Sequence, residues 1–263
     1  MIYNAPHFKL GLVTAAVSAL VACGGGGSGV ASSGISTTVM DGLISNALVC
    51  VDTNNNGACD SGEIQGRTDS KGKVTLNVPS EQIGSARLVA MIGTDATDLD
   101  TGPVTTPYTL QTPAGKHDVI SPLTTMVQAK MDADKVGFDT AEAQVKAQMG
   151  LTVSVFDDYI AMRGKSAAHK KADVMARLLV VSAKKSKKSK ESCDSDTDDK
   201  EHDHDKEKKI RSNLLARLSD FRVASDQVLA MIAQGKDNFA KDYEAEIEGL
   251  SPEVKHCVVA GTP

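Results

Sequence analysis

Apolar and polar residues alternate over short stretches in the first half of the chain. Lys73 to Val78 alternates strictly, as a strand with one buried face does. Other short apolar runs are bounded by turn residues. The strand candidates are 39–44, 47–51, 73–78, 86–92 and 107–112. Several short strands at this spacing predict a small β-sandwich over residues 35–118.

After residue 118 the pattern changes to the spacing of amphipathic helices. Ser121-Pro122 is an N-cap residue followed by proline at the first helical position, and Gly150 is placed to close the next helix. Two longer helices are expected at 167–185 and 208–233. The predicted fold class is therefore α+β and multidomain, with a β-sandwich over 35–118 followed by an α-helical bundle over 119–263.

A run of charged residues separates the two long helices. Fourteen of the residues in 186–207 are Lys, Asp or Glu, and such a charged run cannot bury a core, so we expect a disordered loop inside the helical domain. His202-Asp203-His204-Asp205 within it has side chains that suit zinc, nickel or copper. The competing interpretation is a solvated charged run without metal.

The first residues have the pattern of a targeting segment. The apolar run that ends at Ala22 is too short to span a bilayer, and Leu20-Val21-Ala22-Cys23 has the pattern of a lipobox. Residues 1–22 are thus predicted to be a lipoprotein signal peptide, with Cys23 lipidated as the new N-terminus and 23–34 a flexible Gly/Ser tether. By resemblance to bacterial lipoproteins, Gly24 favours sorting to the outer membrane. The predicted location is therefore the bacterial cell envelope, with membrane lipid as a partner.

Composition and cysteine count further narrow the possible classes of protein. The formal net charge is −5, which gives no indication of nucleic-acid binding. Four cysteines remain besides Cys23, and an even number in an exported chain suggests disulfides. Cys50 with Cys59 is the natural pair, which leaves Cys193 with Cys257.

One motif carries chemistry. Residues 52–63 match the pattern D-x-[DN]-x-[DN]-G-x5-E of a calcium loop at every defined position. Calcium takes six to eight oxygen ligands, so the chain must curl around it, and Gly57 permits the sharp turn. The predicted ligands are Asp52, Asn54, Asn56, the carbonyl of Ala58, Asp60 and Glu63. The alternative is a hairpin loop without metal, because turns use the same residue types.

Four further aspartates lie in two other predicted turns or loops. Asp69 either reaches the same ion from a neighbouring hairpin or is a plain turn aspartate. Asp95, Asp98 and Asp100 lack a complete ligand pattern, so we interpret them as a solvated loop.

The flanks of the calcium motif resemble known domains. Residues 46–51, the motif itself and 68–74 together are similar to the B-type domains of serine-aspartate repeat adhesins and to carboxypeptidase-regulatory-like (transthyretin-like) domains. The resemblance implies a calcium-stabilised sandwich that acts as a spacer or binding module. Residues 120–127 resemble a segment that follows such domains in proteobacterial surface lipoproteins. Cys50 and Cys59 depart from the adhesin pattern and suggest a disulfide that reinforces the loop.

The predicted function is a membrane-anchored, non-enzymatic surface module with a structural Ca²⁺ site. Its partner would be an envelope component, a glycan or another cell surface. Neither G-x-S-x-G nor H-E-x-x-H occurs in the sequence. The alternatives are a periplasm-facing lipoprotein that handles a transition metal through His202 and His204, and an enzyme whose site is assembled from dispersed residues.

Overall fold

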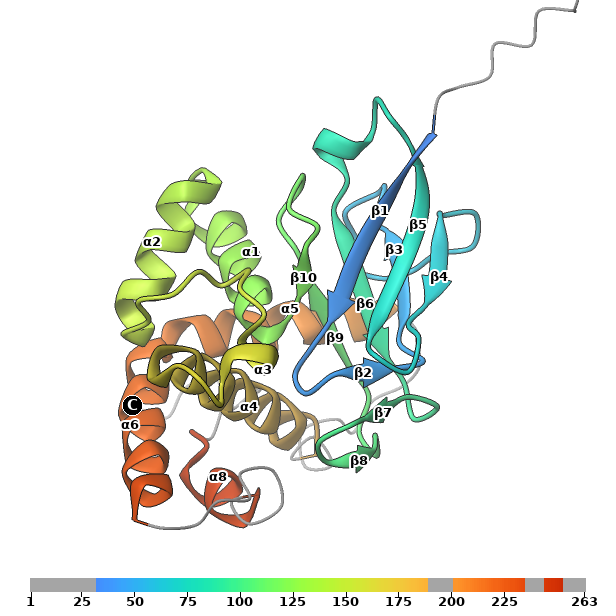
Figure 1. The fold of residues 1–263 in the computed structure, drawn as a ribbon. Coiled ribbons are helices and arrows are strands. Elements are labelled where there is room, and N and C mark those ends of the chain that lie inside the picture. Colours follow the sequence, from blue (N-terminus) through green and yellow to red (C-terminus); the bar gives the residue numbers. More distant parts are fainter. Residues whose placement is uncertain (1–31, 189–200, 235–243, 253–263) are drawn as a thin grey trace, which may run out of the picture. The chain divides into compact units, whose positions relative to one another are not determined.

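The computed structural model describes residues 32–188, 201–234 and 244–252, and it has the predicted α+β class (Figure 1). The strands are β1 (Ser32–Val39), β2 (Ile44–Ser45), β3 (Leu48–Val51), β4 (Gln65–Arg67), β5 (Lys73–Pro79), β6 (Leu88–Ile92), β7 (Thr97–Asp98), β8 (Gly102–Pro103), β9 (Tyr108–Gln111) and β10 (Val119–Ile120). The helices are η1 (a 3-10 turn, Ile83–Ser85), α1 (Pro122–Asp134), α2 (Phe138–Met149), α3 (Tyr159–Met162), α4 (Ala167–Lys188), α5 (Glu201–Ala216), α6 (Leu218–Ala233) and α8 (Glu244–Leu250).

The strands form three small sheets with the orders β10-β1-β5, β2-β7-β8 and β4-β3-β6-β9. Alternate residues of β5 are buried, as the period-two pattern predicts, with Val74, Leu76 and Val78 pointing inward. They share one hydrophobic core with residues of β3, β6 and β9 such as Val49 and Leu110. The first and third sheets therefore bury a common apolar interior.

The first strand starts earlier than expected. The Gly/Ser tether was predicted to reach residue 34, and a strand was predicted over 39–44. In the structure β1 covers Ser32–Val39 and pairs with β5 from Ser32↔Pro79 to Thr38↔Lys73. Of the predicted strand, only Val39, the last residue of β1, and Ile44, the first residue of β2, lie in strands. Strand pairing uses backbone groups, so a Ser/Thr-rich segment pairs once Ile35 and Val39 can be buried.

Helix α1 begins and α2 ends where the sequence places them. The Ser121 side chain accepts a hydrogen bond from Thr124 N, and the Thr124 hydroxyl in turn accepts one from Ser121 N, which forms a capping box before Pro122. Gly150 closes α2 in the left-handed conformation with φ 65°. Local chemistry is enough to set both boundaries.

The long helix predicted at 208–233 is two helices. Arg217 has φ −116° and ψ 17°, and this non-helical conformation interrupts the helix between α5 and α6. The break keeps Leu214, Leu218 and Phe221 inside the same helical core. Helix α4 also extends to Lys188 and α5 starts at Glu201, so both ends of the predicted disordered loop 186–207 are helical. Residues 189–200 lie outside the described part.

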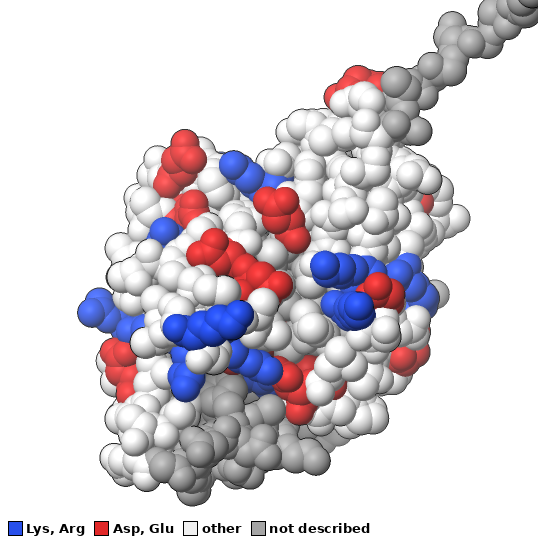
Figure 2. Space-filling view, viewed as in Figure 1, with Lys and Arg blue, Asp and Glu red and all other residues white. Residues whose placement is uncertain are grey.

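The strands and helices are joined by buried contacts. Met40 and Val119 belong to the helical core, and Val180 of α4 belongs to the core of the sheets. The Tyr159 hydroxyl donates to the Met40 carbonyl at 3.1 Å. By its contacts, 31–263 forms one compact unit. Positive and negative side chains are intermixed on the face shown in Figure 2. Over the described residues, no helix combines the length and apolar character that crossing a membrane requires.

Candidate metal centre

The calcium-like loop, residues 52–63, leaves the sheet directly at the end of β3. Val51 N donates to Ile64 O at 2.9 Å, so the two chain ends of the loop are hydrogen-bonded to each other. Asp52 N donates to Arg87 O at 2.9 Å, which extends the pairing of β3 with β6 into the loop. The sheet thereby fixes where the loop starts and where it returns.

A disulfide pins the loop to the sheet. Cys50 on β3 is bonded to Cys59, with Cα atoms 5.5 Å apart, and this confirms the predicted pair. The register aligns Cys50 with Val89 and Val89 with Gln111, so these residues form a row across the sheet. Val49 and Val51 point to the shared core on the other face. The disulfide therefore holds the loop on the face opposite the core.

Three of the predicted ligand side chains converge inside the loop. The Asp60 Oδ2 atom accepts hydrogen bonds from Asn54 Nδ2 at 2.8 Å and from Asn56 Nδ2 at 2.7 Å. The two amide oxygens accept from backbone donors, Asn54 Oδ1 from Asn56 N and Asn56 Oδ1 from Ala58 N. The alternating pattern Asn-x-Asn thus points both amides to one carboxylate.

The two end positions of the motif hold the loop closed. The buried Asp52 carboxylate accepts from Asn56 N at 3.1 Å and from Gly57 N at 2.9 Å. Glu63 accepts from Thr53 N at 2.8 Å and from Asp60 N at 3.0 Å. Gly57 has φ 79°, the left-handed conformation that a glycine at this position was expected to supply.

The donor set is composed of oxygen atoms. Carboxylates, carboxamides and a backbone carbonyl are the ligands that calcium takes, whereas zinc and copper prefer imidazole or thiolate. Within the ranges that the structure describes, no three His, Cys, Asp or Glu side chains form a group that could hold a metal. Asp52 and Glu63 bond to the backbone of the loop, and Asn amides stand beside Asp60. Calcium would require each amide to turn its oxygen toward the ion.

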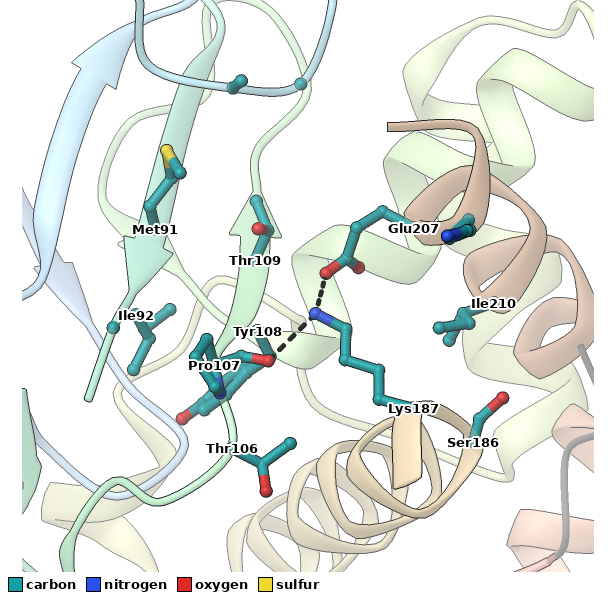
Figure 3. Close-up of a pocket in the computed structure, with 14 residues that line it drawn as sticks. Met91, Ile92, Thr106, Pro107, Tyr108, Thr109, Ser186, Lys187, Glu207 and Ile210 are labelled. Carbon is teal, nitrogen blue, oxygen red and sulfur yellow. Dashed lines mark hydrogen bonds and ion pairs between the residues drawn. The ribbon is translucent and has the colours of Figure 1, made fainter. Parts of the chain in front are cut away.

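A cavity of about 430 Å³ lies beside the loop (Figure 3). Gly57 and Ala58 of the loop line it, together with residues of β6, β9, α4 and α5. The Lys187 ammonium group on α4 pairs with Glu207 on α5 and donates to Pro107 O at 2.9 Å, as the dashed lines in Figure 3 mark. This ion pair joins the two helices across the opening, and the remaining lining is mostly apolar.

Other predicted site residues lie elsewhere or outside the description. The Asp69 Oδ1 atom accepts from Lys71 N at 2.7 Å and from Lys73 N at 2.9 Å, and these bonds lower its pKa. Its carboxylate is thus engaged in the turn. The residues that fall outside the described residues, or whose side chains do, are Cys23, Cys193, His202, His204 and Cys257.

The interpretation of 95–100 as a solvated loop is wrong for two of its three aspartates. Asp95 is exposed and paired with Arg67 at 2.8 Å. Asp98 is only 2% exposed. Arg163 donates to both oxygens of Asp100, at 2.6 and 3.0 Å, and Arg177 donates to Asp100 as well. These arginines are 63 and 77 positions from Asp100 in the sequence, so the residues of the acidic loop do not reveal the pairing.

Further charges surround these pairs. Asp173, which is fully buried, lies 3.3 Å from Arg163 Nη1 and 3.6 Å from Arg177 Nε. The buried Asp41 carboxylate accepts from the Tyr108 hydroxyl at 3.3 Å. We call this set the buried ionic network. Its charged members are Asp41, Asp98, Asp100, Arg163, Asp173 and Arg177.

Burial shifts the proton affinities in this network. It raises the pKa of Asp41 to about 7, with the charge of Asp98 adding to the effect. Burial likewise raises the pKa of Asp173 to about 6, although two guanidinium groups oppose the shift. Burial acts the same way on Asp100, but the hydrogen bonds and charges of Arg163 and Arg177 outweigh it and hold the pKa of that carboxyl below its usual range.

Comparisons with known proteins give no relative. No protein-family model, no curated protein and no solved structure matches this chain. The functional argument therefore rests on the residues and their arrangement.

Proposed function

We propose that this chain is an exported, lipid-anchored surface lipoprotein in which a structural calcium ion stabilises a non-enzymatic binding or spacer module. Cys23 would carry the lipid, and the loop at 52–63 would hold the ion. The partner of the module would be an envelope component, a glycan or another cell surface.

The observation that supports the calcium site is the convergence of Asn54, Asn56 and Asp60 in a loop closed at its base. A backbone hydrogen bond from Val51 and the disulfide between Cys50 and Cys59 hold the two arms together. A site held in this way loses little chain entropy on binding, which favours the ion. Calcium would then stabilise the fold by mass action.

The proposal also includes the relationship to transthyretin-like modules. Sheets that share one core, with an oxygen-rich loop following β3, are compatible with the resemblance drawn from the sequence. A spacer of this kind needs rigidity rather than a reactive group. The calcium ion would add rigidity to the loop, which is otherwise held by the disulfide and by hydrogen bonds within the loop.

The test is thermal unfolding of the full chain, purified in a neutral detergent, before and after calcium is added to metal-depleted protein. At a calcium concentration 100 times the Kd, we expect stabilisation by about 2.7 kcal/mol, seen as a rise in melting temperature. Magnesium should give a smaller rise, because it demands a tighter octahedral shell.

The variant for this test is Asp60→Asn combined with Asn54→Ala, which removes ligands but leaves Asp52 and Glu63 to close the loop. Its melting temperature should not respond to calcium. Asp95→Asn, which removes an exposed carboxylate outside the loop, is the matched control and should respond like the unmodified chain. An unmodified chain that does not respond, or a loop variant that responds fully, would contradict the calcium site.

The lipid anchor is tested separately. Cells that express the chain are labelled with radioactive palmitate, and the labelled protein is compared with a Cys23→Ser variant. We expect label in the membrane fraction for the unmodified chain and none for the variant. Label that persists in the variant would refute lipidation at Cys23 without affecting the calcium proposal.

A further inference from the structure

A second cavity, of about 640 Å³, also lies beside the calcium-like loop. Asn55 and Asn56 of the loop contribute to its lining, as do Arg87, which precedes β6, and Arg211 of α5. The two arginines are 124 positions apart by their residue numbers, 211 and 87. The fold brings them to one cavity from different secondary structure elements.

Arg87 is buried and Arg211 is part-buried. The side chain of Arg87 is 9% exposed and that of Arg211 is 12% exposed. Arg87 donates to Gln111 Oε1. A Cβ atom placed on Gly57 would lie 3.6 Å from Arg211 Nη2 and 4.0 Å from Gln111 Oε1, so Arg211 lies against the same spot. Two positive charges therefore meet beside one neutral amide.

Three buried donors at this place have no acceptor among the described residues. They are Arg87 Nε, Arg211 Nη1 and Gln111 Nε2. Among the described residues, the carboxylates that approach these two arginines are those of Asp52, 3.8 Å from Arg87 Nε, and Glu207, 4.0 Å from Arg211 Nη1. Both distances exceed hydrogen-bond length. Buried donors without acceptors are costly, and a cluster of them is uncommon in folded proteins.

The charged and apolar side chains around the second cavity both bear on the kind of ligand it could hold. Burial lowers the pKa of Arg211, and the neighbouring charge of Arg87 lowers it further, while Glu207 opposes them. Lys135 and Lys208 add positive charge at the cavity, whereas Asp132 and Asp205 add negative charge. The Asp132 carboxylate already accepts from Gln128 Nε2 at 2.9 Å. The remaining lining includes apolar side chains such as that of Met131.

We propose that this cavity is a binding site for a small organic oxyanion, a carboxylate or a phosphate ester, which Arg87 and Arg211 hold together. The planar guanidinium fork matches both kinds of oxyanion, and each such hydrogen bond is charge-assisted. The volume exceeds that of a bare phosphate and lies within the range of small-molecule sites. The apolar lining would receive the body of the ligand.

The experiment is isothermal titration calorimetry of the full chain in neutral detergent with inorganic phosphate, phenyl phosphate and benzoate. Metal is removed beforehand with a chelating resin, because dissolved EDTA is itself a polycarboxylate. The measurement therefore does not depend on the calcium proposal. We expect saturable binding of at least one of the three probes. Phenyl phosphate as the tightest would identify a phosphate ester, and benzoate as the tightest would identify a carboxylate.

Variants separate the proposed site from general charge effects. Arg211→Gln should weaken binding about tenfold or more, since it removes a charge-assisted bond. Arg211→Lys should weaken it less, because lysine keeps the charge but loses the fork. Lys208→Gln, at an exposed position of the cavity, should weaken it slightly and keeps a measurement available if the arginine variants do not fold. Arg222→Gln, an exposed arginine on α6, removes the same charge elsewhere and should bind as the unmodified chain does.

Two results would overturn the proposal. One is that none of the three probes binds at millimolar concentration. The other is that binding is equally strong in the unmodified chain, Arg211→Gln and Lys208→Gln, which would place the anions somewhere else on the protein.

Discussion

The calcium-like loop and the buried ionic network both collect aspartates, but they treat charge in opposite ways. In the loop, the carboxylates accept hydrogen bonds from residues at most ten positions away, and Asp60 and the asparagines remain accessible to water. In the network, Asp100 is paired with Arg163 and Arg177, which are 63 and 77 positions away, and Asp173 is fully buried.

This difference separates charges that stabilise the fold from charges that leave a site open to a ligand. A carboxylate that is solvated and bonded to nearby backbone can exchange those partners for an ion at small cost. A carboxylate that is buried between guanidinium groups has already paired, and any change there exposes an uncompensated charge. Four predictions test this contrast.

The largest effect is expected from removing the central cation of the network. Arg177→Met leaves Asp100 and Asp173 with one guanidinium group, and breaking a buried pair in this way costs about 3–5 kcal/mol. Chemical denaturation of the variant measures the loss in the free energy of unfolding. Arg67→Gln, which breaks the exposed pair with Asp95, should cost at most about 1 kcal/mol. Equal losses in both variants would contradict the contrast.

The next effect is a pH dependence from Asp41. Its pKa is raised to about 7 in the folded chain, so the folded state binds a proton that the unfolded state has released above about pH 4. The free energy of unfolding should therefore fall as the pH rises from about 4 to about 7, by at most about 1.4 kcal/mol per pH unit from this group. Asp173 adds the same sign up to its pKa of about 6.

The variant that checks this dependence is Asp41→Asn. Denaturation at a series of pH values should show a flatter profile than that of the unmodified chain, with the relative gain in stability largest above pH 7. Asp100→Asn should behave differently, because the pKa of Asp100 is lowered and its contribution is lost only in acid. If the pH profile is unchanged in Asp41→Asn, another group causes the pH dependence of the free energy of unfolding.

A smaller effect is expected from the disulfide that anchors the calcium-like loop. The bridge closes a chain of nine residue steps, and the entropy of such a loop corresponds to about 2.5 kcal/mol. Cys50→Ala combined with Cys59→Ala should lower the free energy of unfolding by that order and weaken calcium binding in calorimetry. A variant with full stability would show that the hydrogen bonds of Glu63 and Asp52 suffice to close the loop.

The smallest effect is a coupling between calcium and the anion. Asp52 is a predicted calcium ligand, and it lies 3.8 Å from Arg87 at the edge of the anion cavity. An ion in the loop would draw the negative charge of Asp52 away from Arg87 and strengthen its attraction for an anion. Saturating calcium should tighten binding of phenyl phosphate about fivefold, or about 1 kcal/mol. An unchanged Kd would show that the two sites act independently.

Features encoded by neighbouring residues were predictable. The N-cap at Ser121, the closing Gly150, the alternation in β5 and the pair Cys50 with Cys59 all follow from local spacing, and the structure confirms them. The start of β1 and the break at Arg217 were missed. A strand of Ser and Thr forms only because β5 pairs with it, and α5 ends where packing of the core requires it.

The α+β class, the disulfide and the order of oxygen-bearing residues in the loop can therefore be derived from the sequence alone, because each depends on residues within about a dozen positions. The burial of Asp98, the pairing of the part-buried Asp100 with Arg163 and Arg177, and the meeting of Arg87 with Arg211 beside the loop appear only in the folded chain. The physical reason is that burial and charge pairing are set by three-dimensional contacts, and the spacing of residues along the chain contains no record of them.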